Sequence, residues 1–206
     1  MGEAIMSVDE TISLFITRLS ERTGFKYLKS RRALKNTVGP IVLEILFFSS
    51  KWNGEGSVEI NADLRISYKK YGAASTAQST VAGVSFRPDN GYWYDISDSD
   101  KFENVLKQFE KDLKDTAVDI FIRFETDYES ACQYLLDEKF YEYKVELDFL
   151  EEVLGDEKIK YRVNEIVEAL TDSERQQIEE YKKGAKNRMW MLNRCNLRYI
   201  VEKGYA

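Results

Sequence analysis

Two strand-like runs joined by a short turn constrain the fold of this chain more than any other feature. Residues 41–52 and 57–68 are rich in β-branched and aromatic side chains, and the turn between them reads Asn53-Gly-Glu-Gly56. Asn-Gly followed by a second glycine supplies the positive-φ residues that hairpin turns require. The sequence therefore predicts an antiparallel hairpin, around which we expect the rest of the chain to pack.

The side-chain pattern along this hairpin indicates where each strand lies. One face of the second strand carries Val58, Ile60, Ala62, Leu64, Ile66 and Tyr68. The other face carries Glu59, Asn61, Asp63, Arg65, Ser67 and Lys69. Such alternation is typical of a sheet with one buried and one wet face. The first strand is apolar on nearly both faces, which predicts a central position.

Further elements precede and follow the hairpin. Ser7 and Glu10 form a capping box ahead of a helix over residues 8–22, and residues 25–28 and 33–38 read as short basic strands. Later strand patterns at 84–86 and 92–96, on either side of a turn, suggest another hairpin or an edge strand.

The apolar spacing becomes helical after residue 98. A helix starts there, a second capping box at Thr126 starts another that runs through residue 136, and the chain beyond residue 141 is helical and charged. Its last helix is capped by Thr171 and carries apolar residues as far as Tyr199. We expect an α+β fold in which an antiparallel sheet of five to six strands is covered by helices. The predicted units are residues 1–138 and a helical C-terminal subdomain, residues 139–206.

Composition excludes several classes of protein. The 206 residues include no histidine, which removes Ser-His-Asp and Cys-His catalysis and imidazole metal sites. Cys132 and Cys195 have no neighbouring ligand residues, so we expect reduced thiols, no metal and no cofactor. Carboxylate or lysine chemistry stays open. The apolar runs are too short to span a bilayer, and we expect a cytoplasmic protein.

Charge is distributed unevenly along the chain. Residues 98–157 hold 19 Asp and Glu against 7 Lys and Arg, a net of −12, whereas residues 175–206 have a net of +5. These blocks either complement one another within the fold or form an acidic face for a basic partner. For the second case, the predicted partner-binding residues are Trp52, Trp93, Tyr94, Asp112, Asp115, Asp119, Glu151 and Glu152.

Other polar groups near the hairpin suggest ligand sites. The turn at residues 49–54 holds a lysine, hydroxyl groups and Trp52, which could together contact a ligand. The alternative is an exposed turn in which the Trp52 ring packs on the edge of the sheet. Asn61 and Asp63, with Glu44 and Glu59 nearby, suggest a carboxylate cluster, although acids on strands commonly face water. The small, uncharged stretch between residues 71 and 83 is either a loose connection or a lid or partner-contacting loop.

The basic C-terminal helix suggests a different function. Its cations are interleaved with Trp190 and Tyr199, a composition found where single-stranded nucleic acid is bound. The residues concerned are Lys182, Lys183, Lys186, Arg188, Arg194 and Arg198. An acidic chain with a pI near 5.0 is a poor general binder of polyanions, so nucleic acid is the alternative partner and a protein the preferred one.

The order of these features resembles a known family. The features are a helix, Gly24-Phe25, basic strands, an apolar strand ending in residues 50–54, a strand with Asn61, and acidic helices over residues 100–136. This order is similar to the bacterial domain-of-unknown-function family 4304 over residues 7–136. The chain departs from the family at two places. Val58 stands where the family usually has an aromatic residue, and Ala62 and Asp63 stand where it usually has a glycine. The resemblance implies no enzymatic activity and, from members near toxin genes, an immunity role.

Overall fold

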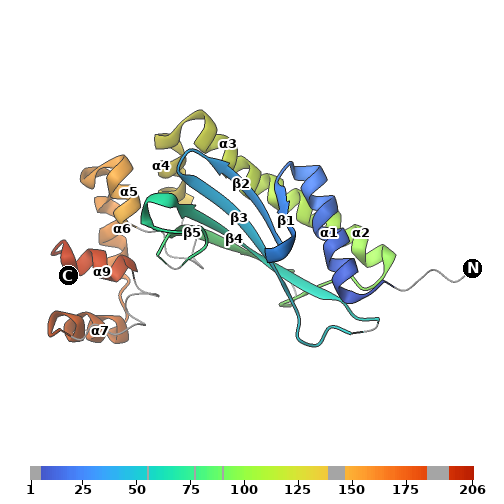
Figure 1. Ribbon diagram of the computed structural model, residues 1–206. Coiled ribbons are helices and arrows are strands. Elements are labelled where there is room, and N and C mark those ends of the chain that lie inside the picture. The colour runs from blue at the N-terminus through green and yellow to red at the C-terminus, as the bar shows by residue number, and fades with distance from the viewer. Residues whose placement is uncertain (1–5, 55, 77, 90, 139–146, 185–194) are drawn as a thin grey trace, which may run out of the picture.

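The computed structural model describes residues 6–54, 56–76, 78–89, 91–138, 147–184 and 195–206. An antiparallel sheet forms its centre, and the first five strands follow one another as a meander (Figure 1). The strands are β1 (Lys26–Leu28), β2 (Ala33–Val38), β3 (Ile41–Ser49), β4 (Glu59–Tyr68), β5 (Thr80–Phe86) and β6 (Tyr94–Asp95). The helices are α1 (Val8–Thr23), α2 (Ser99–Leu113), α3 (Asp119–Thr126), α4 (Tyr128–Glu138), α5 (Leu147–Leu154), α6 (Asp156–Glu168), α7 (Asp172–Lys182) and α9 (Cys195–Glu202). The predicted α+β fold is confirmed.

The predicted hairpin is the centre of the sheet. β3 pairs with β4 from Ile41 opposite Tyr68 to Ser49 opposite Ile60, and β3 lies between β2 and β4 as expected. Of the two alternatives for the later strands, the edge strand is confirmed and the hairpin is wrong, because β5 and β6 do not pair with each other. β6 pairs with β4 beside Ile60, whereas β5 ends opposite Ala62, so both strands share one edge of β4.

The polar face of β4 is less exposed than its sequence predicts. Asn61, Asp63 and Ser67 are buried. Ser75 in the loop after β4 donates its backbone N–H to Ser67 Oγ at 2.8 Å, and the Asn61 amide donates to the carbonyl of Tyr92 at 3.4 Å. The prediction of a wet face is wrong at these positions because two connecting loops fold back over the sheet.

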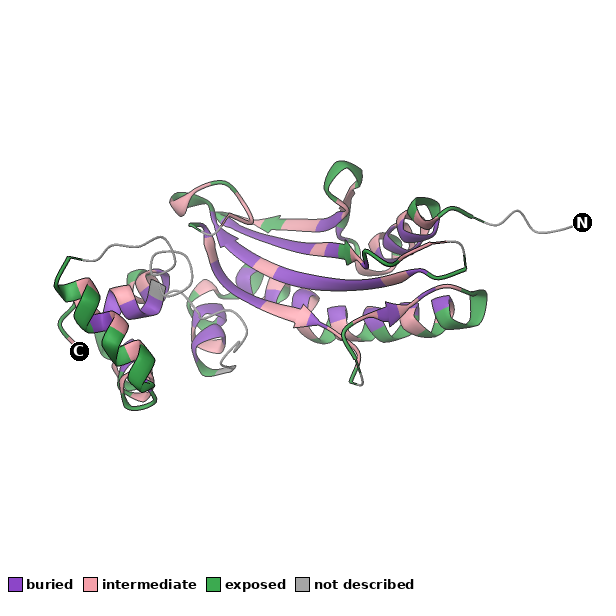
Figure 2. Ribbon diagram, turned by 90° about the horizontal axis from the view of Figure 1, so that it is seen from below, coloured by how far each residue is buried: buried purple, intermediate pink, exposed green. Residues whose placement is uncertain are grey.

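Helices α1 and α2 bury the apolar face of the sheet (Figure 2). Phe15 of α1, Phe47 of β3 and Phe109 of α2 meet in the core, with ring centroids between 5.5 and 6.5 Å apart. The predicted capping box at Ser7 starts α1, and Gly24 ends it at a φ of +75°. The spacing of apolar residues in each element therefore produces one continuous core.

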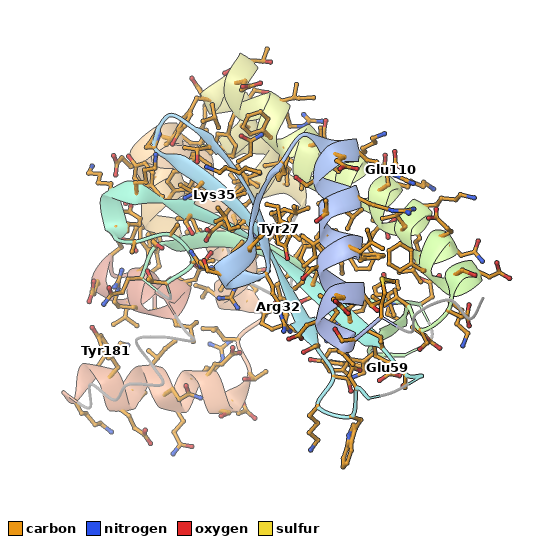
Figure 3. All side chains as sticks on the ribbon, turned by 45° about the vertical axis from the view of Figure 1, so that its right-hand side comes forward. Tyr27, Arg32, Lys35, Glu59, Glu110 and Tyr181 are labelled. Carbon is orange, nitrogen blue, oxygen red and sulfur yellow. The ribbon has the colours of Figure 1, made fainter. Side chains whose placement is uncertain are left out.

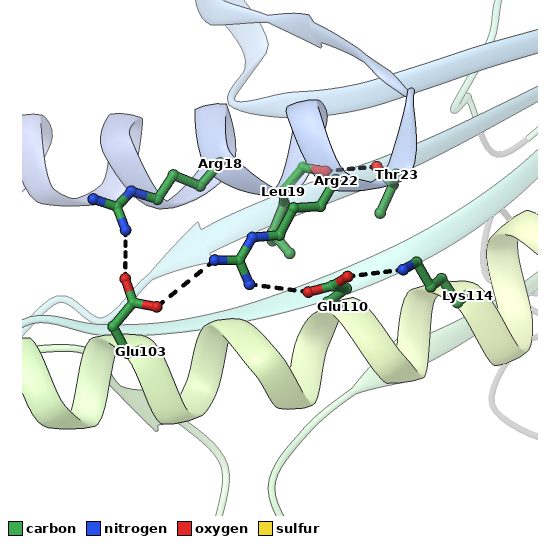
Figure 4. Close-up of polar contacts among 7 residues, drawn as sticks. All are labelled: Arg18, Leu19, Arg22, Thr23, Glu103, Glu110 and Lys114. Atoms are coloured by element: carbon green, nitrogen blue, oxygen red, sulfur yellow. Dashed lines mark hydrogen bonds and ion pairs between the residues drawn. The ribbon is translucent and has the colours of Figure 1, made fainter.

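Ion pairs join the polar sides of α1 and α2 (Figure 4). Arg22 lies between Glu103 and Glu110, with N–O distances of 3.7 and 2.9 Å, and Arg18 also donates to Glu103. Lys114 contacts Glu110 at 2.8 Å. Each such partly exposed pair contributes at most about 1 kcal/mol. The basic residues of α1 thus complement the acidic segment, while the aromatic core supplies most of the stabilisation.

The helix after residue 98 extends as far as predicted, but it is not α-helical throughout. α2 continues through a π-helical turn, Lys114–Val118, into α3. α4 then begins with Asp127 as its cap, accepting the backbone N–H of Ser130 at 3.1 Å. The predicted cap, Thr126, is instead the last residue of α3, and its hydroxyl donates to the Ile122 carbonyl. Asp127, one residue later, therefore caps α4 in place of Thr126.

The C-terminal helices pack at the end of the sheet where β4 finishes (Figure 1). The rings of Tyr68 and Phe149 lie 4.9 Å apart, and the Tyr68 hydroxyl and Lys70 Nζ donate to Glu152 at 3.1 and 2.6 Å. The predicted division of the chain near residue 139 lies outside the described residues and stays a prediction. None of the helices described is both long and apolar enough to cross a bilayer.

The last predicted helix is only partly confirmed. Thr171 and Glu174 form the expected capping box of α7. The helix was expected to reach Tyr199, but α7 ends at Lys182 and is followed by Gly184 at a φ of +96°. Residues 185–194 lie outside the described part of the chain, and Tyr199 belongs to the separate helix α9.

Candidate partner-binding surface

A groove of about 940 Å³ opens between the N-terminal ends of α1 and α2. Its apolar lining residues are Met6, Val8, Leu14, Val58, Ile96 and Phe102. Its polar lining residues are Ser7, Glu10, Thr11, Arg18, Ser97, Asp98, Ser99 and Glu103, and the β3–β4 loop adds Gly54 and Gly56. Concave sites that combine apolar walls with a few polar groups are the usual form of a binding site.

The two helix starts in this groove already carry their own anions. The Glu10 carboxylate accepts the backbone N–H of Ser7 at 2.8 Å, and Asp98 accepts that of Lys101 at 2.9 Å. These hydrogen bonds lower the pKa of both carboxyls, which therefore stay ionised at neutral pH. Because the acids occupy the positive helix ends, the groove favours an apolar or cationic group over a further anion.

Exposed aromatic side chains lie at the same end of the sheet. Trp52, in the β3–β4 loop, is 79% exposed, so the alternative of a ring packed on the sheet edge is wrong. Phe48 and Tyr92 are also exposed. Phe48 lies opposite Asn61 on β4, and Asn61 in turn bonds to Tyr92. Phe48, Trp52 and Tyr92 are thus exposed aromatic residues at this end, and the Arg87 guanidinium lies 3.9 Å from the centroid of the Tyr92 ring.

The other two predicted aromatic anchors are less accessible. Tyr94 is buried, with its ring centroid 4.5 Å from that of Phe109, so the prediction that Tyr94 is exposed is wrong. Its place on β6 explains the difference, because its side chain points into the core between β4 and α2. Trp93 is half-buried and its ring lies 5.2 Å from that of Tyr92. Of this pair, only Trp93 contacts one of the exposed aromatic residues.

The predicted helix acids differ in their surroundings. Asp119 forms an ion pair with Arg123 at 2.7 Å. Asp112 is half-buried, and burial raises the pKa of its carboxyl. Among the described residues, neither Asp112 nor the exposed Asp115 has an ion-pair partner within 4.0 Å. These two acids are open to an external cation in a way that Asp119 is not.

Glu151 and Glu152 are bound within the chain. Lys203 of the C-terminal segment contacts Glu151 at 2.6 Å, and Lys70 contacts Glu152 at the same distance. Arg198 similarly contacts Asp148 at 2.7 Å. Charge complementation within the fold, the alternative left open by the sequence, therefore accounts for this part of the acidic segment.

The carboxylates of the sheet do not gather into one cluster. Glu44 accepts from Arg31 at 3.0 Å, whereas Asp63 accepts from Ser85 at 2.8 Å. The Glu59 backbone is held by Asn53 in the β3–β4 loop. Within the described residues, no group of His, Cys, Asp or Glu has the arrangement of a metal site.

The basic helix does not form a continuous stripe in the part that is described. Lys182 contacts Glu179 at 3.1 Å, Arg198 is paired with Asp148, and Lys183 is exposed. The remaining predicted nucleic-acid contacts, Lys186, Arg188 and Arg194, lie outside the described residues. Figure 3 shows Tyr181 on α7, well away from the labelled residues of the sheet.

The groove is the part of this surface that sequence reasoning missed. Both of its helix caps were visible as local signals, but their meeting depends on how α1 and α2 pack on the sheet. The buried Cys132 thiol is not part of the groove, and burial raises the pKa of that thiol to about 12.

The chain matches no family model, and searches of curated proteins and of solved structures also found no match.

Proposed function

We propose that the protein is a non-catalytic module that binds a basic protein, and that it serves as an immunity protein for a toxin. The family resemblance suggests the second part. The first is carried by one observation: a groove with ionised carboxylates on its rim lies at the same end of the sheet as the exposed Trp52. The absence of histidine from the sequence further favours binding over catalysis.

The two features contribute differently to binding. Glu10, which has no ion-pair partner among the described residues, attracts a basic surface and raises the association rate, an effect that salt weakens, whereas Asp98 is already paired with Lys101 at 3.3 Å. Trp52 supplies apolar area, and truncation of an aromatic side chain at the centre of an interface costs about 2–4 kcal/mol of binding free energy. The partner thus carries lysine or arginine around an apolar contact.

Site-specific photo-crosslinking tests the proposal. A benzophenone amino acid replaces Trp52 in the full chain, and the matched control replaces Tyr161, an aromatic residue of α6 that is 43% exposed. We expect one basic protein to crosslink at position 52 and not at 161, with the yield falling as salt rises. Equal crosslinking at both positions contradicts the proposal, and a product that disappears on nuclease treatment supports the nucleic-acid alternative.

A further inference from the structure

The loop after β4 is fastened to the polar face of the sheet through one residue. Ser75 donates its backbone N–H to Ser67 Oγ at 2.8 Å and its hydroxyl to Glu44, and its carbonyl accepts from Arg65 at 3.5 Å. Ser67 and Arg65 lie on β4, and Glu44 lies on the neighbouring strand β3. The N–H, hydroxyl and carbonyl of a single serine thus each contact a different side chain of the sheet.

Glu44 is an unusual residue for the middle of a sheet. It is fully buried, and its register neighbours are Lys35 on β2 (labelled in Figure 3) and Arg65 on β4. A buried carboxylate is tolerated only when its oxygens are bonded. Here Arg31 donates to one oxygen at 3.0 Å and Ser75 to the other. Opening of the loop therefore leaves one strong acceptor free.

Residues 72–76 have few other contacts with the sheet among the described residues, although the loop is anchored after them by Ser79, whose carbonyl accepts the N–H of Tyr68 at 2.8 Å. Residues 72–76 are small and uncharged, so they bury no large apolar side chain. Ser75 has a φ of +58°, a left-handed conformation that is costly for a residue other than glycine and persists only when its surroundings enforce it. Bonds from Thr76 and Ser79 to the Ala73 carbonyl, at 2.9 and 2.5 Å, keep the loop in shape independently of the sheet.

We propose that residues 72–76 form a lid, that Ser75 is its latch, and that Glu44, Ser67 and Arg65 form a site beneath it for a seryl or threonyl residue of a peptide. The carboxylate accepts the ligand's hydroxyl, Ser67 accepts its N–H, and Arg65 donates to its carbonyl. Ser75 occupies this site in the closed state, so ligand binding and lid closure compete. The proposal does not depend on the groove between α1 and α2.

Hydrogen exchange tests the latch. In Ser75→Ala we expect the amide of residue 75, which donates to Ser67, to exchange about tenfold faster because the hydroxyl bond to Glu44 is lost, whereas the amides of residues 76 and 79, which donate within the loop, keep their rates. The amides of β3 and β4 keep their rates. The control is Ser57→Ala, a serine of the β3–β4 loop that is exposed. An unchanged exchange rate at the amide of residue 75, or equal acceleration in the sheet, overturns the proposal.

A peptide titration followed by NMR tests the site. The probes are acetyl-Ala-Ser-Ala-amide and its all-alanine analogue, added to wild type and to Ser75→Ala. We expect the seryl peptide to shift the amides around Ser67 at least about fivefold more strongly in Ser75→Ala, where the competing hydroxyl is absent. The alanine peptide leaves these amides unchanged. Equal shifts from both peptides, or none from the seryl peptide, overturn the site beneath the lid.

Discussion

The two ends of the sheet use acidic side chains in opposite ways. At the end where β4 finishes, Glu151, Glu152 and Asp148 are each bound by a cation of the same chain. At the end that holds the β3–β4 loop, Glu10 and Asp98 cap helices and border an open groove; Asp98 is paired there with Lys101 at 3.3 Å, whereas Glu10 has no ion-pair partner among the described residues. The first end is closed by the C-terminal helices, and the second leaves apolar and acidic groups accessible.

This difference shows why net charge alone does not locate a binding surface. The segment from 98 to 157 carries most of the acidic excess, yet cations from elsewhere in the chain occupy its C-terminal part. An acid that is paired within the fold has little attraction left for a partner, because its field is already cancelled at close range. Which acids remain open depends on the fold.

Phe149→Ala should have the largest effect on stability, because it removes packing at the end of the sheet that the C-terminal helices close. Phe149 is fully buried and contacts Tyr68 and Tyr128. Loss of its ring leaves a cavity, and we expect the free energy of unfolding, measured in urea, to fall by about 3–5 kcal/mol. Crosslinking from position 52 should survive under conditions where the variant is folded, because the β3–β4 loop that holds Trp52 lies at the other end of the sheet.

Ile122→Ala is the matched control for this variant. Ile122 is an apolar residue of α3 that is 52% exposed, and removal of an exposed side chain changes stability by no more than about 0.5 kcal/mol. If Phe149→Ala abolished crosslinking in the folded state, the two ends would be coupled and the comparison between them would fail.

Elements with a local cause could be predicted from the sequence. The hairpin follows from alternation and the Asn53-Gly54 turn, and the capping boxes at Ser7 and Thr171 need only residues three positions apart. The central position of β3 also follows from its own composition. Each of these signals is contained within one or two neighbouring elements.

The features of the candidate site have causes that are distant in sequence. The pairing of β6 with β4 buries Tyr94, although nothing near Tyr94 distinguishes it from the half-buried Trp93. Glu152 is matched to Lys70 across the fold, and Ser75 returns to Glu44 through a loop without apolar residues. Sequence patterns identify such side chains but do not show which of them meet.

Met6→Lys should have an intermediate effect, confined to the open end. Met6 lines the groove and is 48% exposed, so a lysine there adds a positive charge to the rim without disturbing the core. We expect association with a basic partner to slow by about tenfold at low salt and by less at high salt. Stopped-flow kinetics with the free partner protein, once crosslinking has identified it, measures this association rate. Met6→Gln, which adds no charge, is the control, and equal slowing by both variants would exclude an electrostatic cause.

Glu152→Gln should have the smallest effect on stability. The pH dependence of this effect tests whether the acid at the end where β4 finishes acts through its ion pair. The hydrogen bond from Lys70 lowers the pKa of the Glu152 carboxyl in the folded protein below its ordinary value. A depressed pKa stabilises the fold above the unfolded value and stops doing so as the pH falls through the folded value. The free energy of unfolding of the wild type should therefore exceed that of the variant by at most about 1 kcal/mol at pH 7. At pH values below the folded pKa, the two free energies should be equal. Asp115→Asn, at an acid without an ion pair in the described structure, should change stability by less at either pH. A Glu152→Gln deficit that persists in acid would mean that the side chain acts through packing and not through its charge.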